Sequence, residues 1–230
     1  MEIGLYLAMT QGEFAAAPVL PGKPVWLGCR FSPEEGTLTG LPPAPSGAVM
    51  VNDSIPFSGC DPAHIIHTLH QHSPAEALIL DFQQPGIPEQ QALVRELVRG
   101  MDCLVIVSEL YAENLTCPVF LSPCPHHVHL KDHIAPWAGR EIWLDLAMDA
   151  SCLTLTKEGC AASPLPCGAA AEQGFAHEPL HCHYRVETGD DFARFILWRT
   201  RKDLHGLARE AEELGVKALV GLWQEWKGSK

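Results

Sequence analysis

The sequence lacks the features that would tie it to a membrane or to nucleic acid. None of its apolar runs approaches the roughly 18 residues that a membrane-spanning helix needs. Basic residues form no run, and the net charge of −12 is unfavourable for a partner with a phosphate backbone. We therefore expect no nucleic acid and no membrane among the partners.

A second absence concerns cysteine motifs and targeting signals. The chain has nine cysteines but no Cys-x-x-Cys. It begins Met1-Glu2 and lacks the basic start of a secretory signal peptide. An odd number of cysteines without such a signal favours reduced, mostly buried thiols. These features predict a cytoplasmic protein.

The motifs of common nucleotide and hydrolase sites are also missing. The sequence has no Walker A motif, no dinucleotide glycine fingerprint and no Gly-x-Ser-x-Gly nucleophile elbow, so we expect no cofactor. Hydrophobic residues make up 47% of the chain and charged residues 19%, values that are typical of an ordered globular protein. No internal repeat or domain boundary is visible, so we predict a single domain over residues 1–230.

What the sequence does contain is an alternation of short apolar runs with amphipathic segments. Residues 77–81 form an apolar run typical of a strand that is buried on both faces. A helix is predicted from Pro88 to about Met101, because apolar residues recur on one face, and a strand follows at 103–107. Further strands are predicted at 3–9, 25–30, 48–52, 119–121, 142–146, 153–156 and 216–223, and further helices at 62–73, 130–137 and 200–214.

This alternation predicts an α/β fold, best fitted by a closed (β/α)8 TIM-like barrel, with an open, mostly parallel sheet as the alternative. The connections 11–24 and 32–47 are rich in Pro and Gly and show no helical period, so we expect a barrel that is irregular in its N-terminal half. The segments 181–187 and 192–199 alternate around Thr-Gly-Asp-Asp and predict a hairpin. Between residues 157 and 180 no period is visible, and we expect a loop or lid.

The stretch from Glu76 to Gly86 ends the fourth predicted strand with an acid, an aromatic residue, two amides and Pro-Gly. It resembles the fourth-strand signature of the chitinase-like barrels of glycoside hydrolase family 18, which reads Asp-Gly-x-Asp-x-Asp-Trp-Glu-Tyr-Pro. Asp81 falls on the last aspartate of that signature and Pro85 on its proline. Gln83 falls on the catalytic glutamate.

The resemblance implies a barrel in which Asp81 holds the acetamido group of a sugar or an equivalent polar group. It also implies that hydrolysis is lost, because the amide of Gln83 has no titrating proton for general-acid catalysis. Looser similarities relate residues 144–149 to the family's sixth strand and place Trp223 beneath the sugar, where an aromatic face would stack on the ring. We therefore expect a protein without hydrolytic activity that binds a saccharide or another small polar ligand.

Carboxylates recur at or just past the ends of the predicted strands, and in a barrel these ends share one face. We therefore expect a ligand cleft at the C-terminal ends of the strands. The predicted ligand-binding residues are Asp81, Gln83, Glu109, Asp145, Trp223 and Glu225, with Asp53 as a further acid at this end. Alternatively, these acids are solvated strand ends, helix caps or salt-bridge partners, and the protein is a non-catalytic interaction module.

Two histidine pairs support a different hypothesis. His127 and His129, and again His181 and His183, are spaced by two residues, which on a strand places each pair on one face. Together with a carboxylate, such pairs would bind a metal ion and form a metal-dependent hydrolase. Cys182 lies between the second pair, points to the opposite face of the same predicted strand, and is therefore expected in the core.

Overall fold

The computed structural model describes residues 3–16, 20–32, 36–42, 47–55, 60–72, 76–166 and 174–227. The chain folds into two compact units, each built from three separate segments. Unit 1 comprises Met1–Ser122, Gly139–Asp145 and Val216–Trp223, and unit 2 comprises Pro123–Ala138, Leu146–Gly215 and Gln224–Lys230. That the two units behave as a single domain stays a prediction.

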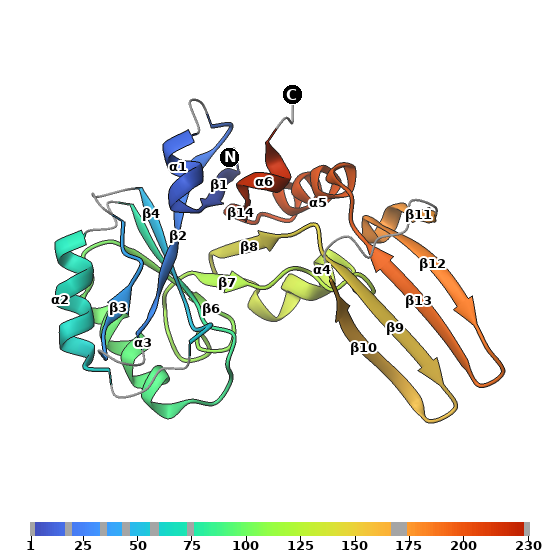
Figure 1. The fold of residues 1–230 in the computed structure, drawn as a ribbon, viewed down its shortest axis with the longest axis horizontal. Helices are drawn as coiled ribbons and strands as arrows, with labels where there is room; N and C mark the ends of the chain where they lie inside the picture. The colour runs from blue at the N-terminus through green and yellow to red at the C-terminus, as the bar shows by residue number, and fades with distance from the viewer. Residues whose placement is uncertain are drawn as a thin grey trace. The chain divides into compact units, whose positions relative to one another are not determined.

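Unit 1 contains a closed barrel of eight parallel strands (Figure 1). The ring closes because β1 (Gly4–Met9) pairs with both β2 (Lys23–Phe31) and β14 (Ala218–Leu222). Between β2 and β14 the ring continues in chain order through β4 (Ala48–Asn52), β5 (Ala77–Asp81), β6 (Leu104–Ser108), β7 (Val119–Leu121) and β8 (Ile142–Leu146). The prediction of a TIM-like barrel is confirmed.

The connections between the early strands of the barrel are irregular, as predicted. Helix α1 (Gln11–Ala16) follows β1, although the sequence shows no helical period there, because six residues are too few to display one. Between β2 and β4 the described residues contain only the two-residue strand β3 (Leu38–Thr39), which is antiparallel to β2. Longer helices follow β4 and β5, namely α2 (Pro62–His72) and α3 (Pro88–Gly100).

Local sequence signals set where these helices begin. Oδ1 of Asp61 accepts a hydrogen bond of 3.0 Å from the backbone N–H of Ala63 and so caps α2. Pro88 lies in the first turn of α3, where its missing N–H would have no partner within the helix. The buried face of α3 includes Leu93 and Leu97, which follow the predicted apolar stripe.

The interior of the barrel is packed with side chains. The rings of Tyr6 and Trp143 lie with their centroids 4.5 Å apart within it. The same buried cluster contains Ala8, Val25, Ala48, Met50, Ala77, Ile79, Ile106, Phe120, Ala218 and Val220. Leu78 and Leu80 of β5 point to the other face of the strand and are also fully buried. Burial on both faces explains the unbroken apolar run of β5.

Unit 2 contains a separate five-stranded antiparallel sheet, in the order β10-β9-β13-β12-β11. Its strands are β9 (Ala150–Thr156), β10 (Gly159–Leu165), β11 (Phe175–His177), β12 (Cys182–Thr188) and β13 (Phe192–Trp198). The remaining helices are α4 (Leu130–Ile134), η1 (Ala135–Trp137), η2 (Glu178–Leu180), α5 (Arg201–Glu213) and α6 (Trp223–Trp226), of which α6 begins at the last residue of unit 1. In the part of the chain that the structure describes, no helix has the length and apolar character that crossing a membrane requires.

The second sheet confirms one prediction and contradicts another. The predicted hairpin is present as β12 and β13, which pair antiparallel. The loop or lid expected over 157–180 is wrong for the described part of that segment, because β10 and β11 lie there. Almost all of β10 is exposed, so it shows no apolar alternation from which a strand could be predicted. Residues 167–173 lie outside the described residues.

Candidate functional site

Polar side chains gather where the fourth barrel strand ends. Asp81 is the last residue of β5 and is half-buried, whereas Gln83 is exposed. Nε2 of Gln83 donates a hydrogen bond to Oδ1 of Asp81. Burial raises the pKa of Asp81 above its ordinary value of 3.8; the hydrogen bond from Gln83 opposes this shift, and the charge of Asp53 adds to it. The structure therefore brings two predicted site residues into contact.

Asp53, which follows β4, holds the turn that carries Gln83. It is 3% exposed. Its Oδ1 accepts a hydrogen bond of 2.9 Å from the backbone N–H of Gln83. Its Oδ2 accepts hydrogen bonds from the backbone N–H of Gln84 at 2.9 Å and from Nε2 of Gln90 at 3.0 Å. Both carboxylate oxygens are thus engaged inside the protein, and Asp53 positions the site instead of lining it.

Residues at the end of β6 hold the same turn from another side. The hydroxyl of Ser108 donates a hydrogen bond of 2.8 Å to the carbonyl of Phe82, and the hydroxyl of Tyr111 donates one to the carbonyl of Gln84. Sequence reasoning did not identify these two residues or Gln90 as parts of the site. No sequence signal links them to it, because they support its backbone from other elements.

The other predicted residues of unit 1 lie within the last two residues of a parallel strand or just past it, so they are at the same end of the barrel. Oε1 of Glu109 accepts a hydrogen bond of 3.3 Å from the backbone N–H of Ser122. Asp145 lies in β8 and Trp223 begins α6, and both are half-buried. Their convergence with Asp81 on one ligand stays a prediction.

The comparison of residues 144–149 with the family's sixth strand is wrong, because β8 is the seventh strand of the ring.

Glu225 belongs to unit 2, and its participation in the predicted site stays a prediction. Burial raises the pKa of Glu225 above its ordinary value of 4.5; the backbone N–H of Met148 opposes this shift, and the charge of Asp149 adds to it. Its Oε2 is buried without a hydrogen-bond partner among the described residues. These surroundings favour the protonated, neutral form of the acid.

The second histidine pair has partners on α5. His181 lies in a turn with a φ of 45°, not on a strand, and its Nε2 is 3.0 Å from Oε2 of Glu210. Nδ1 of His183 is 3.0 Å from Oδ2 of Asp203. Cys182 between them is 1% exposed, which confirms that it is a core residue. Burial raises the pKa of its thiol to about 11.

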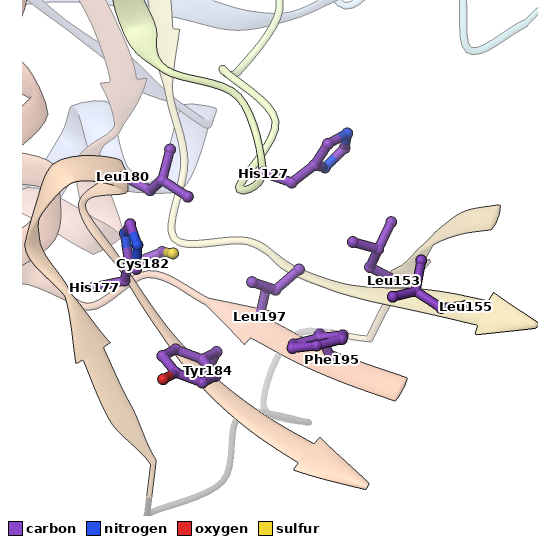
Figure 2. A pocket seen from close by; sticks show the side chains of 9 residues that line it. All are labelled: His127, Leu153, Leu155, His177, Leu180, Cys182, Tyr184, Phe195 and Leu197. Atoms are coloured by element: carbon purple, nitrogen blue, oxygen red, sulfur yellow. The ribbon is translucent and has the colours of Figure 1, made fainter. Parts of the chain in front are cut away.

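The first histidine pair lies in the segment before α4, not on a strand. Nδ1 of His129 is 3.2 Å from the carbonyl oxygen of Pro179, and His127 lines an apolar pocket (Figure 2). Within the described ranges, no group of three or more His, Cys, Asp or Glu side chains is arranged to hold a metal ion. The structure therefore adds no support to the metal-dependent alternative.

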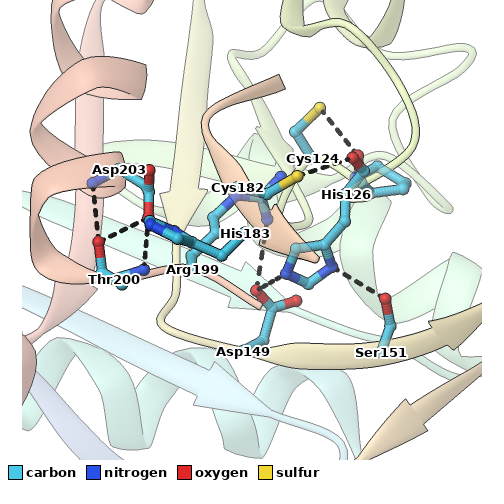
Figure 3. A network of polar contacts seen from close by, with 10 residues as sticks. Cys124, His126, Asp149, Ser151, Cys182, His183, Arg199, Thr200 and Asp203 are labelled. Atoms are coloured by element: carbon cyan, nitrogen blue, oxygen red, sulfur yellow. Dashed lines mark hydrogen bonds and ion pairs between the residues drawn. The ribbon is translucent and has the colours of Figure 1, made fainter. Parts of the chain in front are cut away.

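A polar cluster in unit 2 was not identified from the sequence (Figure 3). His126 is 2% exposed; its Nδ1 lies 3.0 Å from Oγ of Ser151, and its Nε2 lies 3.3 Å from Oδ1 of Asp149. Nη1 of the buried Arg199 lies 3.3 Å from the same oxygen of Asp149. His126, the stretch from Asp149 to Ser151, and Arg199 are far apart in the sequence and form no motif, so only the fold brings them together.

Comparisons with known proteins relate this chain to others by fold. No protein-family model matches the sequence, and no curated protein is similar to it in sequence. The chitinase-like agglutinin RobpsCRA from Robinia pseudoacacia matches with a TM-score of 0.61 and 12% identity, over 97% of this chain and 96% of that one. The class V chitinase from Nicotiana tobaccum matches with a TM-score of 0.58 and 11% identity, over 98% and 96%.

A glutamate-to-glutamine mutant of the same Nicotiana tobaccum chitinase, solved in complex with NAG4, matches with a TM-score of 0.57 and 12% identity, over 98% of this chain and 96% of that one. At such low identity the similarity establishes the fold alone. It agrees with the strand order of unit 1, in which the segment that resembles the family signature is indeed the fourth strand of the barrel. The chain has the fold of the chitinase-like TIM barrels of glycoside hydrolase family 18, to which it is only remotely similar in sequence.

Proposed function

We propose that the barrel of unit 1 binds a saccharide at the C-terminal ends of its strands and does not hydrolyse it. The observation that carries this proposal is the hydrogen bond from Nε2 of Gln83 to Oδ1 of Asp81. It joins the counterparts of two signature residues. Asp81 keeps the acid of the signature's last aspartate, whereas Gln83 has an amide in place of the catalytic glutamate.

The acids available around this turn support the proposed absence of hydrolysis. Cleavage of a glycosidic bond needs one carboxylic acid that protonates the leaving oxygen and a second group that stabilises the sugar cation. Gln83 cannot donate a titrating proton. The carboxylate of Asp53 is buried against backbone N–H groups and the Gln90 amide. Asp81 is then the one carboxyl at this turn that a ligand would reach.

The binding of a sugar follows from the groups that remain. The carboxyl of Asp81 accepts hydrogen bonds, and the amide of Gln83 both donates and accepts them. Hydroxyl and acetamido groups of sugars have the same two capacities. The turn that carries both side chains is fixed by Asp53 and Tyr111, so little conformational entropy would be lost when a ligand binds.

The structural relatives are consistent with this proposal. One is described as an agglutinin, and the tobacco chitinase mutant in which glutamine replaces a glutamate was solved with NAG4. A barrel of this fold can therefore hold an oligosaccharide when glutamine stands in place of glutamate. Gln83 is a glutamine in the native sequence of this chain.

Isothermal titration calorimetry with the N-acetylglucosamine tetramer and with unacetylated oligosaccharides tests the binding. We expect wild-type protein to bind at least one of these ligands and Asp81→Ala to lose the binding. Asp102→Ala is the matched control, because Asp102 is an exposed aspartate just before β6, at the opposite end of the barrel. Absence of binding across the panel, or unchanged binding in Asp81→Ala, would refute the proposal.

The release of reducing ends from the same oligosaccharides tests the absence of hydrolysis. We expect none from the wild type. Gln83→Glu is the constructive variant, since it restores a titratable acid at this position. Hydrolysis that appears only in Gln83→Glu would establish the missing acid as the cause of inactivity. A wild-type rate that survives in Gln83→Ala would show that another residue supplies the acid.

A further inference from the structure

Unit 2 brings a serine, a histidine and an aspartate into contact (Figure 3). Oγ of Ser151 lies 3.0 Å from Nδ1 of His126, and Oδ1 of Asp149 lies 3.3 Å from Nε2 of the same ring. Serine hydrolases use these three side chains as nucleophile, base and orienting acid, and they are recognised by geometry instead of sequence order. Here the two ring nitrogens exchange places: Nδ1 faces Ser151 and Nε2 faces Asp149, so the triad would work with the ring proton on Nε2.

The surroundings of Asp149 suit an orienting carboxylate. Nη1 of Arg199 lies 3.3 Å from Oδ1 of Asp149, and the backbone N–H of Arg199 donates to the carbonyl of Asp149 at 3.3 Å. Burial acts to raise the pKa of Asp149, but the nearby His126 and Arg199 outweigh it, and the pKa lies below its ordinary value of 3.8. Asp149 is therefore ionised at neutral pH.

The contact between His126 and Asp149 is loose. Nε2 of His126 lies within ion-pair distance of Asp149 but is not aligned for a regular hydrogen bond with any of the described residues. Catalytic hydrogen bonds are often long or poorly aligned until a substrate binds. The side chain of Asp149 is 41% exposed, which leaves its carboxylate room to rotate towards the ring.

Ser151 shares a face of the sheet with residues that line an apolar pocket, and Figure 2 shows that lining. Leu153 and Leu155 follow it at alternate positions of β9, and Leu197 of β13 is its cross-strand partner, so all four side chains lie on the same face. The three leucines line a pocket with a volume of about 400 Å³. Ser151 therefore faces the same side of the sheet as this lining, two residues before Leu153, whereas Cys152 points to the other face.

The pocket is linked directly to the segment that carries the histidine. Cys182 lines the pocket, and its thiol donates a hydrogen bond of 3.6 Å to the carbonyl of His126. The rest of the lining is Phe195, Tyr184, Leu180, His127 and His177, and the exposed surface of the pocket is almost wholly apolar. The volume lies within the range of about 300–1,000 Å³ that is usual for small-molecule pockets. Such a lining suits a hydrocarbon chain and offers a sugar few hydrogen bonds.

We propose that unit 2 is an esterase site in which Ser151 is the nucleophile, His126 is the base and the pocket holds an apolar acyl chain. Oγ of Ser151 forms a bond to the carbonyl carbon of the ester while Nδ1 of His126 takes the hydroxyl proton. The bond from that carbon to the alcohol oxygen then breaks, and His126 gives its proton to the leaving oxygen. Water attacks the acyl-serine in the same way, releasing the carboxylic acid and restoring Ser151.

Covalent labelling of the purified full-length chain tests the nucleophile. A fluorophosphonate probe should attach to the peptide that contains Ser151, as identified by mass spectrometry after proteolysis, and Ser151→Ala should prevent it. Ser163→Ala is the matched control, because Ser163 is an exposed serine on the neighbouring strand β10 and should leave the labelling unchanged. No labelling, or labelling only at other residues, would overturn the proposal.

Hydrolysis of p-nitrophenyl esters from acetyl to dodecanoyl tests the acyl pocket. Each methylene group that enters the pocket should raise kcat/KM by up to about fourfold, until the pocket is full. Ser151→Ala should lower the rate by at least about a hundredfold, and Ser163→Ala should not change it. An esterase rate that persists in folded Ser151→Ala would contradict the assignment of the nucleophile. A kcat/KM that does not change with the length of the acyl chain would contradict the assignment of the pocket. If Ser151→Ala does not fold, the labelling of the wild-type chain decides.

The esterase proposal does not depend on the saccharide proposal. Its residues all belong to unit 2, whereas Asp81 and Gln83 belong to unit 1. Saccharide binding in Ser151→Ala and fluorophosphonate labelling in Asp81→Ala should both match the wild type. Each experiment therefore fails or succeeds without the other.

Discussion

Oδ1 of Asp53 accepts a hydrogen bond of 2.9 Å from the backbone N–H of Gln83, 30 residues further along the chain. The contact joins the end of the third barrel strand to the turn after the fourth. A carboxylate that the sequence presents only as a further acid at the strand ends thus accepts a hydrogen bond from the backbone of a predicted ligand-binding residue. Asp53 holds the backbone of Gln83, and both of its carboxylate oxygens are engaged within the protein.

Replacing Asp53 by Asn should destabilise the protein. Asparagine has one side-chain oxygen, so its NH2 group would take the place of Oδ2 of Asp53. There it would face the backbone N–H of Gln84 and the side-chain NH2 of Gln90, and buried donors would be left without an acceptor. We expect the free energy of unfolding to fall by about 2–3 kcal/mol. Urea denaturation measures the change. Asp102→Asn, at an exposed position, should stay within about 0.5 kcal/mol of the wild type. Equal effects of the two substitutions would contradict the structural role of Asp53.

Replacing Asp81 by Asn should stabilise the unliganded protein at neutral pH. The pKa of Asp81 in the folded chain lies above the ordinary value of 3.8, so the folded state holds this proton more tightly than the unfolded state. Stability therefore falls as the pH rises from about 3.8 through the raised pKa, and is then constant with respect to this group. Asn is neutral throughout and keeps the oxygen that accepts from Gln83.

Thermal melts of the wild type and of Asp81→Asn between acid and neutral pH measure this difference. The melting temperature of the variant should exceed that of the wild type at neutral pH, and the two should converge below pH 3.8, where Asp81 is protonated in both states. A gap that is independent of pH would show that the substitution acts through packing instead of charge.

The start of α5 gives a test of local sequence signals. Oγ1 of Thr200 accepts a hydrogen bond from the backbone N–H of Asp203, and Oδ2 of Asp203 accepts one of 2.8 Å from the backbone N–H of Thr200. This reciprocal pair forms a capping box. Thr200→Ala should lower the free energy of unfolding by about 1 kcal/mol, and Thr200→Ser should preserve it. Similar losses in both variants would mean that the methyl group of Thr200, not its hydroxyl, is what matters.

The single domain predicted from the sequence remains to be tested by unfolding. Each unit is assembled from three segments of the chain, so β14 of the barrel is reached only after the chain has passed through the second sheet. We expect one cooperative transition, because neither unit can be completed by a continuous piece of chain. Trp143 in unit 1 and Trp198 in unit 2, each kept as a sole tryptophan, should report the same urea midpoint. Two separate midpoints would establish two domains.

The barrel was predictable because its strands carry the strongest patterns in the sequence. The bounds of β4, β5, β7 and β8 agree with the prediction, since unbroken apolar runs end at polar or turn residues there. The second sheet was not predicted as a sheet, because some of its strands have weak apolar patterns. Its edge strand β10 is almost wholly exposed, and short strands with small and polar residues resemble a loop when only the sequence is read.

The candidate sites were less predictable than the fold, because they depend on contacts between distant segments. The family signature pointed to Asp81 and Gln83, which are two residues apart in the sequence and which the structure brings into contact. It gave no sign of Asp53 as their support, nor of the contact between His126 and Ser151, which are 25 residues apart. The histidine pair at 181 and 183 was placed on a strand, whereas His181 lies in a turn with positive φ, so spacing by two does not align these side chains.

Closure of the barrel by β1 and β14 has a consequence for the order in which the chain folds. Gly4 pairs with Ala218, so the ring cannot close until the two extremities of unit 1 meet. The strand–helix–strand segments β4–α2–β5 and β5–α3–β6 are connected by short stretches of chain and should form earlier. Contacts over short sequence separations cost less entropy of loop closure. Until β14 arrives, the edge of β1 that it will occupy has unpaired backbone groups, which are open to pairing with other chains. During synthesis on the ribosome, this edge of β1 would stay unpaired until residues 218–222 had been made.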